Sequence, residues 1–133
     1  MNEVKFEELV GKTLTSIAHI KESQRWCEHI VFTAADGKEW RMWHDTDCCE
    51  SVKVEDISGN LADLIGSPIL MAEEVTSKEG TAKEAYDDSF TWTFYKLATV
   101  KGSVTIRWYG TSNGYYSEKV SFGEIEEEQK CDQ

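Results

Sequence analysis

The densest group of chemically active side chains lies at residues 44–50, with the sequence His-Asp-Thr-Asp-Cys-Cys-Glu. One imidazole, three carboxylates and two thiols in seven residues can bind a metal, shift one another's pKa or supply a nucleophile. Imidazole, thiolate and carboxylate are together the ligand set of zinc, which is typically tetrahedral in proteins. The segment therefore contains a candidate metal site, with zinc as the candidate ion, at His44, Asp47, Cys48, Cys49 and Glu50.

The spacing of these residues also permits a structural interpretation. Zinc motifs separate their cysteines by about two to four residues, whereas Cys48 and Cys49 are neighbours and point apart on an extended chain. We expect instead that one cysteine is buried as a small hydrophobic residue and that His44 hydrogen-bonds a nearby carboxylate. A reactive thiol is a further alternative, because a nearby His44 lowers a thiol pKa, although the adjacent carboxylates oppose that effect.

An aromatic run before this segment positions His44. On a strand, Trp40, Met42 and His44 share one face, and Trp40 and Met42 are typical core residues. We therefore expect His44 at the end of a buried face, where its imidazole needs a hydrogen-bonding partner.

The acidic residues that follow form a second candidate. If Val52 and Val54 point to the core, Glu55 faces away from it and Asp56 returns inward. Carboxylates gathered in this way bind the metal ions of metal-dependent nucleases. The alternative, which we prefer, is a solvated face with turn-capping side chains.

A third group of candidate residues combines an arginine with tyrosines near one hairpin. If Ile106 and Trp108 face the core, Arg107 and Tyr109 lie outside it. Tyrosine and arginine are typical of interface hot spots and of base-stacking pockets, and aromatic pairs also stabilise an ordinary hairpin. We predict a binding surface here, with hairpin packing as the alternative. Its residues are Arg107, Tyr109, Asn113, Tyr115 and Tyr116.

Alternating apolar residues predict a mainly β domain. The expected strands are residues 13–20, 30–34, 39–44, 51–57, 69–75, 90–95, 103–109 and 115–122. Asp36-Gly37 predicts a hairpin turn, and residues 5–10 and 60–66 predict short helices. The last three strands are separated by tight turns, which is typical of an antiparallel meander. We expect an α+β fold, mainly β, in which about seven or eight antiparallel strands form a sandwich or barrel with one or two short helices.

Composition limits the domain organisation and the partners. The chain has 133 residues and one proline, so we expect a single globular domain over 1–123 and an acidic flexible tail over 124–133. The net charge of −11 argues against direct binding of nucleic-acid phosphates. The N-terminus lacks an apolar signal region and no apolar run is long enough to span a bilayer, so we expect no membrane association. The spacing of the four cysteines does not favour disulfides, and we expect a cytoplasmic protein with reduced thiols.

Many of these residues also match the pattern of a family. The pattern joins His44 and Asp-Cys-Cys-Glu at 47–50 to Glu-Asp-Ile at 55–57, Asp-Leu-Ile-Gly-Ser-Pro-Ile at 63–69 and Ala-Glu-Glu at 72–74. It continues through Thr-Trp-Thr-Phe-Tyr at 91–95 and Trp-Tyr-Gly at 108–110 to Ser-Asn-Gly-Tyr-Tyr-Ser at 112–117. The chain thus resembles, over residues 10–122, a small family of uncharacterised domains with a His…Asp-Cys-Cys-Glu signature, found largely in phages, prophages and bacteria. The resemblance implies an origin and a domain rather than a reaction.

These observations favour a binding function. We expect a non-enzymatic accessory protein of phage or prophage type that binds a host protein or a small signalling molecule in the cytoplasm and antagonises a host defence or regulatory pathway. Acidity and exposed aromatic residues support this hypothesis, which requires no cofactor. Two alternatives stay open: a metal-binding protein or a metal- or thiol-dependent enzyme centred on residues 44–50, and a structural module that oligomerises through a sheet edge.

Overall fold

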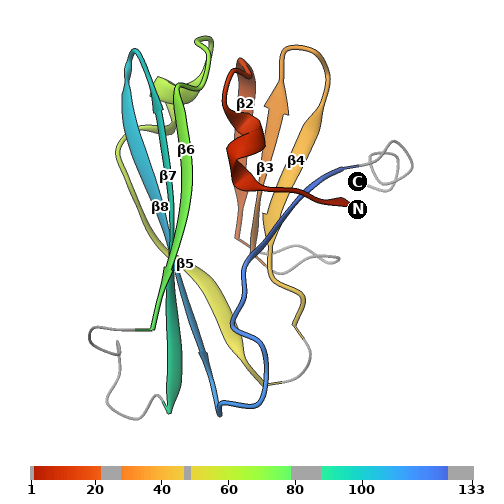
Figure 1. Ribbon diagram of the computed structural model, residues 1–133, viewed down its shortest axis with the longest axis vertical. Helices are drawn as coiled ribbons and strands as arrows, with labels where there is room; N and C mark the ends of the chain where they lie inside the picture. Colours follow the sequence, from red (N-terminus) through yellow and green to blue (C-terminus); the bar gives the residue numbers. More distant parts are fainter. Residues whose placement is uncertain (1, 22–27, 47–48, 79–87, 126–133) are drawn as a thin grey trace.

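The computed structural model describes residues 2–21, 28–46, 49–78 and 88–125, which form two facing antiparallel sheets (Figure 1). The elements in chain order are β1 (Asn2–Glu3), η1 (Phe6–Leu9), β2 (Leu14–Ile20), β3 (His29–Ala34), β4 (Glu39–Trp43), β5 (Ser51–Ser58), η2 (Leu61–Leu64), β6 (Met71–Ser77), β7 (Ser89–Thr99), β8 (Gly102–Ser112) and β9 (Ser121–Glu124). One sheet has the order β1-β9-β4-β3-β2 and the other β5-β8-β7-β6. The prediction of a mainly β, antiparallel, sandwich-like fold is confirmed. The two expected short helices are single 3₁₀ turns, η1 and η2.

The core lies between the two sheets. Along each strand, alternate side chains point inward, and both sheets contribute these inward residues to the core. In β8, Ile106 and Trp108 are fully buried, as are Trp40 and Met42 in β4. The indole N–H of Trp108 donates to the sulfur of Met42 at 3.1 Å, which joins the sheets at the centre. Each large apolar side chain removed from water in this way contributes about 1.5 to 3 kcal/mol. Trp40 and Met42 therefore occupy the core face predicted for them.

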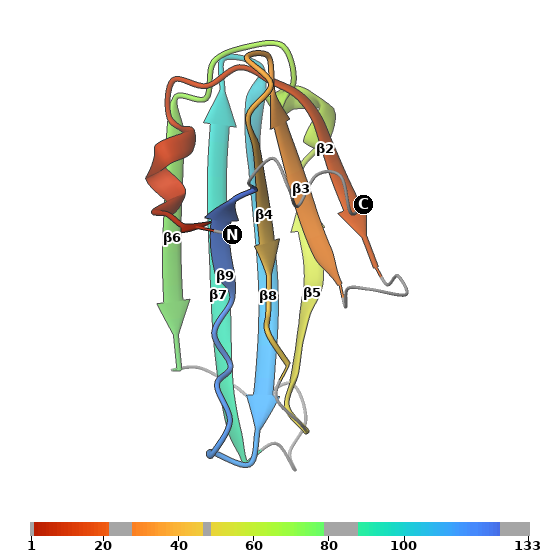
Figure 2. The same cartoon turned by 90° about the vertical axis from the view of Figure 1, so that its right-hand side faces the viewer.

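The N-terminal turn η1 closes one edge of the core. Its Phe6 packs edge-on against Tyr95 of β7, with ring centroids 4.7 Å apart, and against Phe122 of β9 at 5.1 Å. In Figure 2 this turn lies beside β6, at the edge of the four-stranded sheet. The packing brings the acidic residues of η1 close to those of β6.

The turn at Asp36-Gly37 and the cap at Asn60 form as the sequence predicts. Lys38 donates its backbone N–H to the Asp36 carboxylate at 3.0 Å, and Gly37 has φ +91°, a left-handed conformation that glycine adopts without strain. Asn60 caps η2, because its side-chain oxygen accepts the Ala62 N–H at 3.0 Å. The Asp-Gly hairpin and the Asn60 cap are both confirmed.

The prediction of a three-strand meander at the end of the chain is wrong for its last strand. Residues 113–120, hereafter the crossing segment, form no strand; β9 starts at Ser121 and pairs with β4 and β1 of the other sheet. Figure 1 shows the chain passing from one sheet to the other after β8. The alternation that predicted a strand arises because Val120 and Phe122 are buried between the sheets.

Ordered structure continues past residue 123, where the tail was expected to begin. Glu124 pairs with Trp40 in the sheet, and the buried Ile125 donates its N–H to the Glu39 carbonyl oxygen at 2.9 Å. The predicted tail residues 126–133 lie outside the described residues.

The expected inward position of Asp56 is also wrong. A bulge between Val54 and Asp56 shifts the register of β5 against β8, so that Asp56 lies opposite Arg107. Asp56 is exposed, and its two carboxylate oxygens accept hydrogen bonds from Arg107 at 3.1 and 2.6 Å. Within the described residues, no helix is long and apolar enough to cross a membrane.

Candidate functional site

His44 lies just past the end of β4, where it is buried together with Glu50. Its Nε2 is 2.9 Å from a Glu50 oxygen, and its Nδ1 is 2.6 Å from the carbonyl oxygen of Lys119 in the crossing segment. The expected hydrogen bond between His44 and a nearby carboxylate is thus confirmed. The same ring ties the crossing segment to both sheets.

The oxygen atoms of Lys119 and Glu50 determine how many hydrogen atoms the hydrogen bonds around His44 require. A carbonyl oxygen accepts only, so Nδ1 of His44 must carry a hydrogen and donate it to Lys119. The contact between Nε2 and Glu50 then requires one more hydrogen, on the ring or on the carboxyl group. In either arrangement both ring nitrogens are engaged. The imidazole has no lone pair directed at a metal while these bonds persist.

The other predicted metal ligands do not join His44 and Glu50 in the described part of the chain. Asp47 and Cys48 lie outside the described residues. Cys49 is exposed and disulfide-bonded, which corrects the expectation of reduced thiols, and a disulfide sulfur is not a thiolate ligand. No group of three His, Cys, Asp or Glu side chains able to hold a metal occurs among the residues that the structure describes.

The predicted binding residues are divided between two faces. Arg107 and Tyr109 point outward from β8, since Ile106 and Trp108 fill the core as expected. Asn113, Tyr115 and Tyr116 belong to the crossing segment.

The outward pair takes part in an aromatic cluster on the outer face of the four-stranded sheet. The Arg107 guanidinium lies 4.8 Å from the ring centroid of Trp92, and Tyr109 lies 4.4 Å from Trp92 and 6.2 Å from Phe90. These contacts bury Tyr109, which was expected outside. Arg107 also pairs with Asp56, so these side chains support one another on the surface of the sheet.

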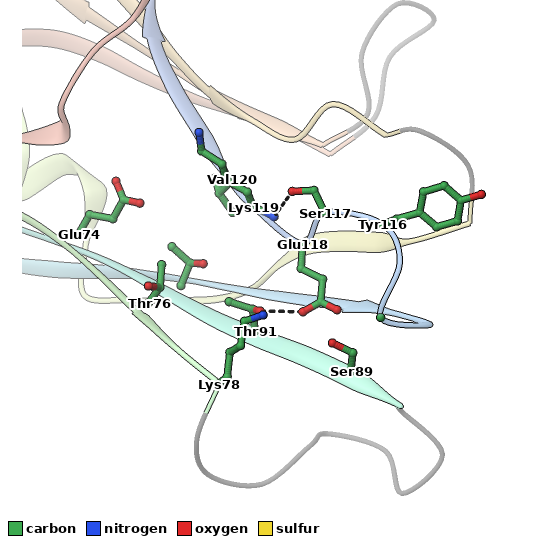
Figure 3. Close-up of a pocket in the computed structure, with 12 residues that line it drawn as sticks. Glu74, Thr76, Lys78, Ser89, Thr91, Tyr116, Ser117, Glu118, Lys119 and Val120 are labelled. Atoms are coloured by element: carbon green, nitrogen blue, oxygen red, sulfur yellow. Dashed lines mark hydrogen bonds between the residues drawn. The ribbon is translucent and has the colours of Figure 1, made fainter.

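A polar hollow of about 350 Å³ opens between the inner face of the four-stranded sheet and the crossing segment (Figure 3). Its lining residues are Glu74, Thr76 and Lys78 at β6, Ser89, Thr91 and Thr93 of β7, and Gly114, Tyr116, Ser117, Glu118, Lys119 and Val120 of the crossing segment. The volume falls in the range of small-molecule sites, about 300 to 1,000 Å³. Of the predicted binding residues, Tyr116 lines this hollow.

Glu118 organises one end of the polar hollow. Its two oxygens accept hydrogen bonds from the hydroxyls of Thr91 at 2.7 Å and Ser112 at 2.6 Å, and Ser89 adds a third. Desolvation is the largest influence on its pKa and raises it, but the three hydrogen bonds and the charge of Lys78 together outweigh it. The pKa of Glu118 is therefore below its ordinary value, and a charged carboxylate is held in a buried position.

Glu74 stands at the other end of the hollow. Partial burial raises its pKa, the nearby Glu7 raises it further, and Lys119 opposes both. Burial also raises the pKa of Tyr95, with Glu74 and Glu3 as further causes, and the Tyr95 hydroxyl donates to the Val120 carbonyl oxygen at 3.4 Å. Three groups with displaced pKa values, Glu118, Glu74 and Tyr95, thus lie in or beside this hollow. Such clustering is typical of functional sites.

A second hollow, of about 700 Å³, lies where β2 of one sheet faces β5 of the other. One of its lining carboxylates, Glu28, is 2.6 Å from Nε2 of His19 and accepts the backbone N–H of Val54 at 2.9 Å. Glu28 therefore satisfies a backbone donor on the free edge of β5. We infer that the contacts of His19 and Glu28 close this edge of the sandwich.

Sequence reasoning missed the polar hollow, although β7 contains a signal for it. Thr91 and Thr93 are buried at inward positions of β7, in line with the core residues Tyr95 and Leu97. Polar side chains on the core face of a strand need buried partners. Glu118, the partner of Thr91, lies in residues 115–122, for which the sequence predicts an ordinary strand.

The sequence matches one family across most of its length. Residues 7–122 match the family described as Domain of unknown function (DUF7448), and the chain belongs to it. No curated protein and no solved structure matches the chain.

Proposed function

We propose that this DUF7448 member is a non-enzymatic binding protein that holds a small polar molecule in the polar hollow. The observation that carries the proposal is the gathering of displaced pKa values and buried hydroxyl groups around one hollow of about 350 Å³. Because Glu118 already accepts hydrogen bonds from Thr91 and Ser112, it fixes their hydroxyls in place. Fixed hydroxyls favour recognition of a ligand over transfer of a proton.

The proposal extends to the biological role expected from the sequence. We infer an accessory protein of phage or prophage type, in the cytoplasm, that interferes with a host pathway by removing a signalling molecule. The resemblance carried by residues 47–50 and 112–117 supports this role, as does the net charge of −11, which disfavours nucleic-acid ligands.

The binding proposal is tested by a screen with a matched pair of variants. A library of polar metabolites is screened by thermal shift, and each hit is measured by calorimetry on the wild type, Thr91→Val and Thr105→Val. Thr91 lines the hollow, whereas Thr105 undergoes the same substitution on the outer face of β8, opposite Lys96. We expect Thr91→Val to weaken binding about tenfold, the effect of about 1.4 kcal/mol, and Thr105→Val to leave it unchanged. An absence of hits, or hits that do not respond to Thr91→Val, would overturn the proposal.

A second candidate function is protein binding through the outer aromatic cluster. Arg107, Tyr109 and Trp92 form an arginine–aromatic cluster of the kind found in interface hot spots. If the protein captures a host protein, and if Trp92→Ser abolishes this capture while Thr91→Val preserves it, protein binding would be favoured over ligand binding.

A further inference from the structure

The register of β6 against β7 places the polar residues of the hollow in successive rows. Glu74 lies opposite Tyr95, Thr76 lies opposite Thr93, and Lys78 follows at the end that contains Thr91. Figure 3 shows Glu74 and Glu118 well separated across the hollow. The hollow therefore has two acidic ends joined by a row of hydroxyl groups.

The hydroxyl groups at the Glu118 end can only accept further hydrogen bonds. Thr91 and Ser112 use their hydroxyl hydrogens on Glu118, and Ser112 also accepts the Gly114 N–H at 3.0 Å. A hydroxyl that has donated its hydrogen retains lone pairs alone. A ligand that reaches Thr91 must therefore bring hydrogen-bond donors.

The two ends differ in their compensating cations. At the Glu118 end, the charge of Lys78 stabilises the carboxylate. At the Glu74 end, Lys119 lowers the pKa of Glu74, but the Lys119 ammonium is also 3.1 Å from the Glu3 carboxylate. Glu7 adds another negative charge to this end. The Glu74 end thus has the greater excess of negative charge.

From the hollow, its hydroxyl acceptors and this charge asymmetry, we propose that the ligand is a small amine whose ammonium group binds Glu74. The rest of the molecule lies over Thr76 and Thr93 and donates hydrogen bonds towards Thr91. This inference deepens the proposed function and rests on it. An ammonium group provides three donors and no acceptor, which matches the carboxylate and hydroxyl oxygens of Glu74, Thr76 and Thr93 in the lining of the hollow.

The ligand class is tested with three four-carbon probes that differ only in their end groups. Putrescine, butanediol and succinate are titrated into the ¹⁵N-labelled full-length protein at about physiological salt, which screens non-specific attraction to an acidic surface. We expect putrescine to shift the amide signals of Thr91, Thr93 and Gly114 saturably. Butanediol should bind at least tenfold more weakly, and succinate should cause no saturable shift.

Matched variants separate the proposed contact from the overall charge. Glu74→Gln and Glu73→Gln remove the same charge from adjacent positions, but Glu73 faces outward beside Lys96. We expect Glu74→Gln to raise the putrescine Kd about tenfold or more, as the loss of one charge-assisted hydrogen bond implies, and Glu73→Gln to change it less than twofold. Equal effects of the two variants would overturn the assignment to Glu74.

Two further outcomes distinguish the inference from the proposed function. If metabolite hits depend on Thr91 but lack an amine, or if succinate binds as well as putrescine, the amine inference fails and the binding function stands. If neither the metabolite screen nor any probe perturbs the hollow, the binding function itself fails. Lysine capped at both ends represents a lysine side chain of a peptide. If this probe binds more tightly than putrescine, the proposal that the ligand is a small molecule fails.

Discussion

His44 shows how a residue that could bind a metal becomes a structural anchor. Both ring nitrogens contact oxygen atoms, and those oxygens belong to parts of the chain that are far apart in sequence, Glu50 and Lys119. Burial strengthens such bonds and makes their loss costly, because each oxygen would remain unsatisfied away from water. The imidazole therefore stabilises the junction of the two sheets and the crossing segment.

Replacing His44 by alanine should destabilise the protein strongly. We expect His44→Ala to lower the free energy of unfolding by about 3 kcal/mol, as for the removal of one partner from a buried pair. His19→Ala is a matched control, because His19 contacts Glu28 with side chains 21% and 10% exposed, compared with 4% and 0% for His44 and Glu50. Urea denaturation should show a cost of about 1 kcal/mol or less for the control. Similar costs for the two variants would contradict the anchoring role.

Glu118 should make stability depend on pH in a defined direction. Its folded-state pKa is below the ordinary value of 4.5, so the charged form stabilises the folded protein above pH 4.5 and the contribution is lost as the pH falls further. At pH 7, Glu118→Gln should cost about 1.5 to 3 kcal/mol, the value of hydrogen bonds to a charged group. The difference between wild type and variant should shrink below pH 4.5. Urea denaturation at several pH values measures it, with Glu73→Gln as the charge-matched control; a constant difference would contradict the argument.

At the scale of elements, the alternation of β7 and β8 was readable from sequence because each strand has one buried face. Two other features were not. The bulge in β5 moves Asp56 outward, and bulges depend on pairing with a partner strand that local sequence does not define. The change of sheet before β9 depends on the contacts of His44 and Thr91 with Lys119 and Glu118 of the crossing segment, which join residues far apart in the chain.

The disulfide at Cys49 and the polar hollow were missed for related reasons. Adjacent cysteines argue against a bond between neighbours, but that argument does not restrict bonds to more distant positions. The hollow depends on which strands face the crossing segment, and sequence alone predicted the wrong partner sheet for β9. The His44–carboxylate contact was predicted because it depends only on the end of one strand and the next few residues.

Gly110 of β8 allows the crossing segment to pack on the four-stranded sheet. A Cβ atom there would lie 3.0 Å from the Cβ and carbonyl oxygen of Glu118 and 3.2 Å from Val52. We expect Gly110→Ala to cost about 1 to 3 kcal/mol through overpacking and to displace Glu118 from Thr91. In the control Gly102→Ala, the added atom would meet the flexible Asp63 carboxylate at 2.9 Å, which can move aside. Urea denaturation of both variants tests the difference, and equal stabilities would contradict it.

At the scale of the whole molecule, the two sheets share one core and should unfold together. The chain leaves the four-stranded sheet after β8 through the crossing segment, and β9 then pairs in the five-stranded sheet. Trp108 of the four-stranded sheet donates a hydrogen bond to Met42 of the five-stranded sheet. Neither sheet can therefore lose its structure without exposing the apolar face of the other. This arrangement predicts a single cooperative transition, as is usual for domains of this size.

Two spectroscopic probes test this cooperativity. Far-ultraviolet circular dichroism follows the sheets, and tryptophan fluorescence follows Trp40 and Trp43 in one sheet and Trp92 and Trp108 in the other. We expect both signals to give the same urea midpoint and slope in the wild type. In His44→Ala the two signals should again agree, at a lower urea midpoint, because His44 adds stability to the whole domain. Separate midpoints in the wild type would show that the sheets unfold independently. A split that arose only in His44→Ala would show that His44 couples two sheets that are otherwise separately stable.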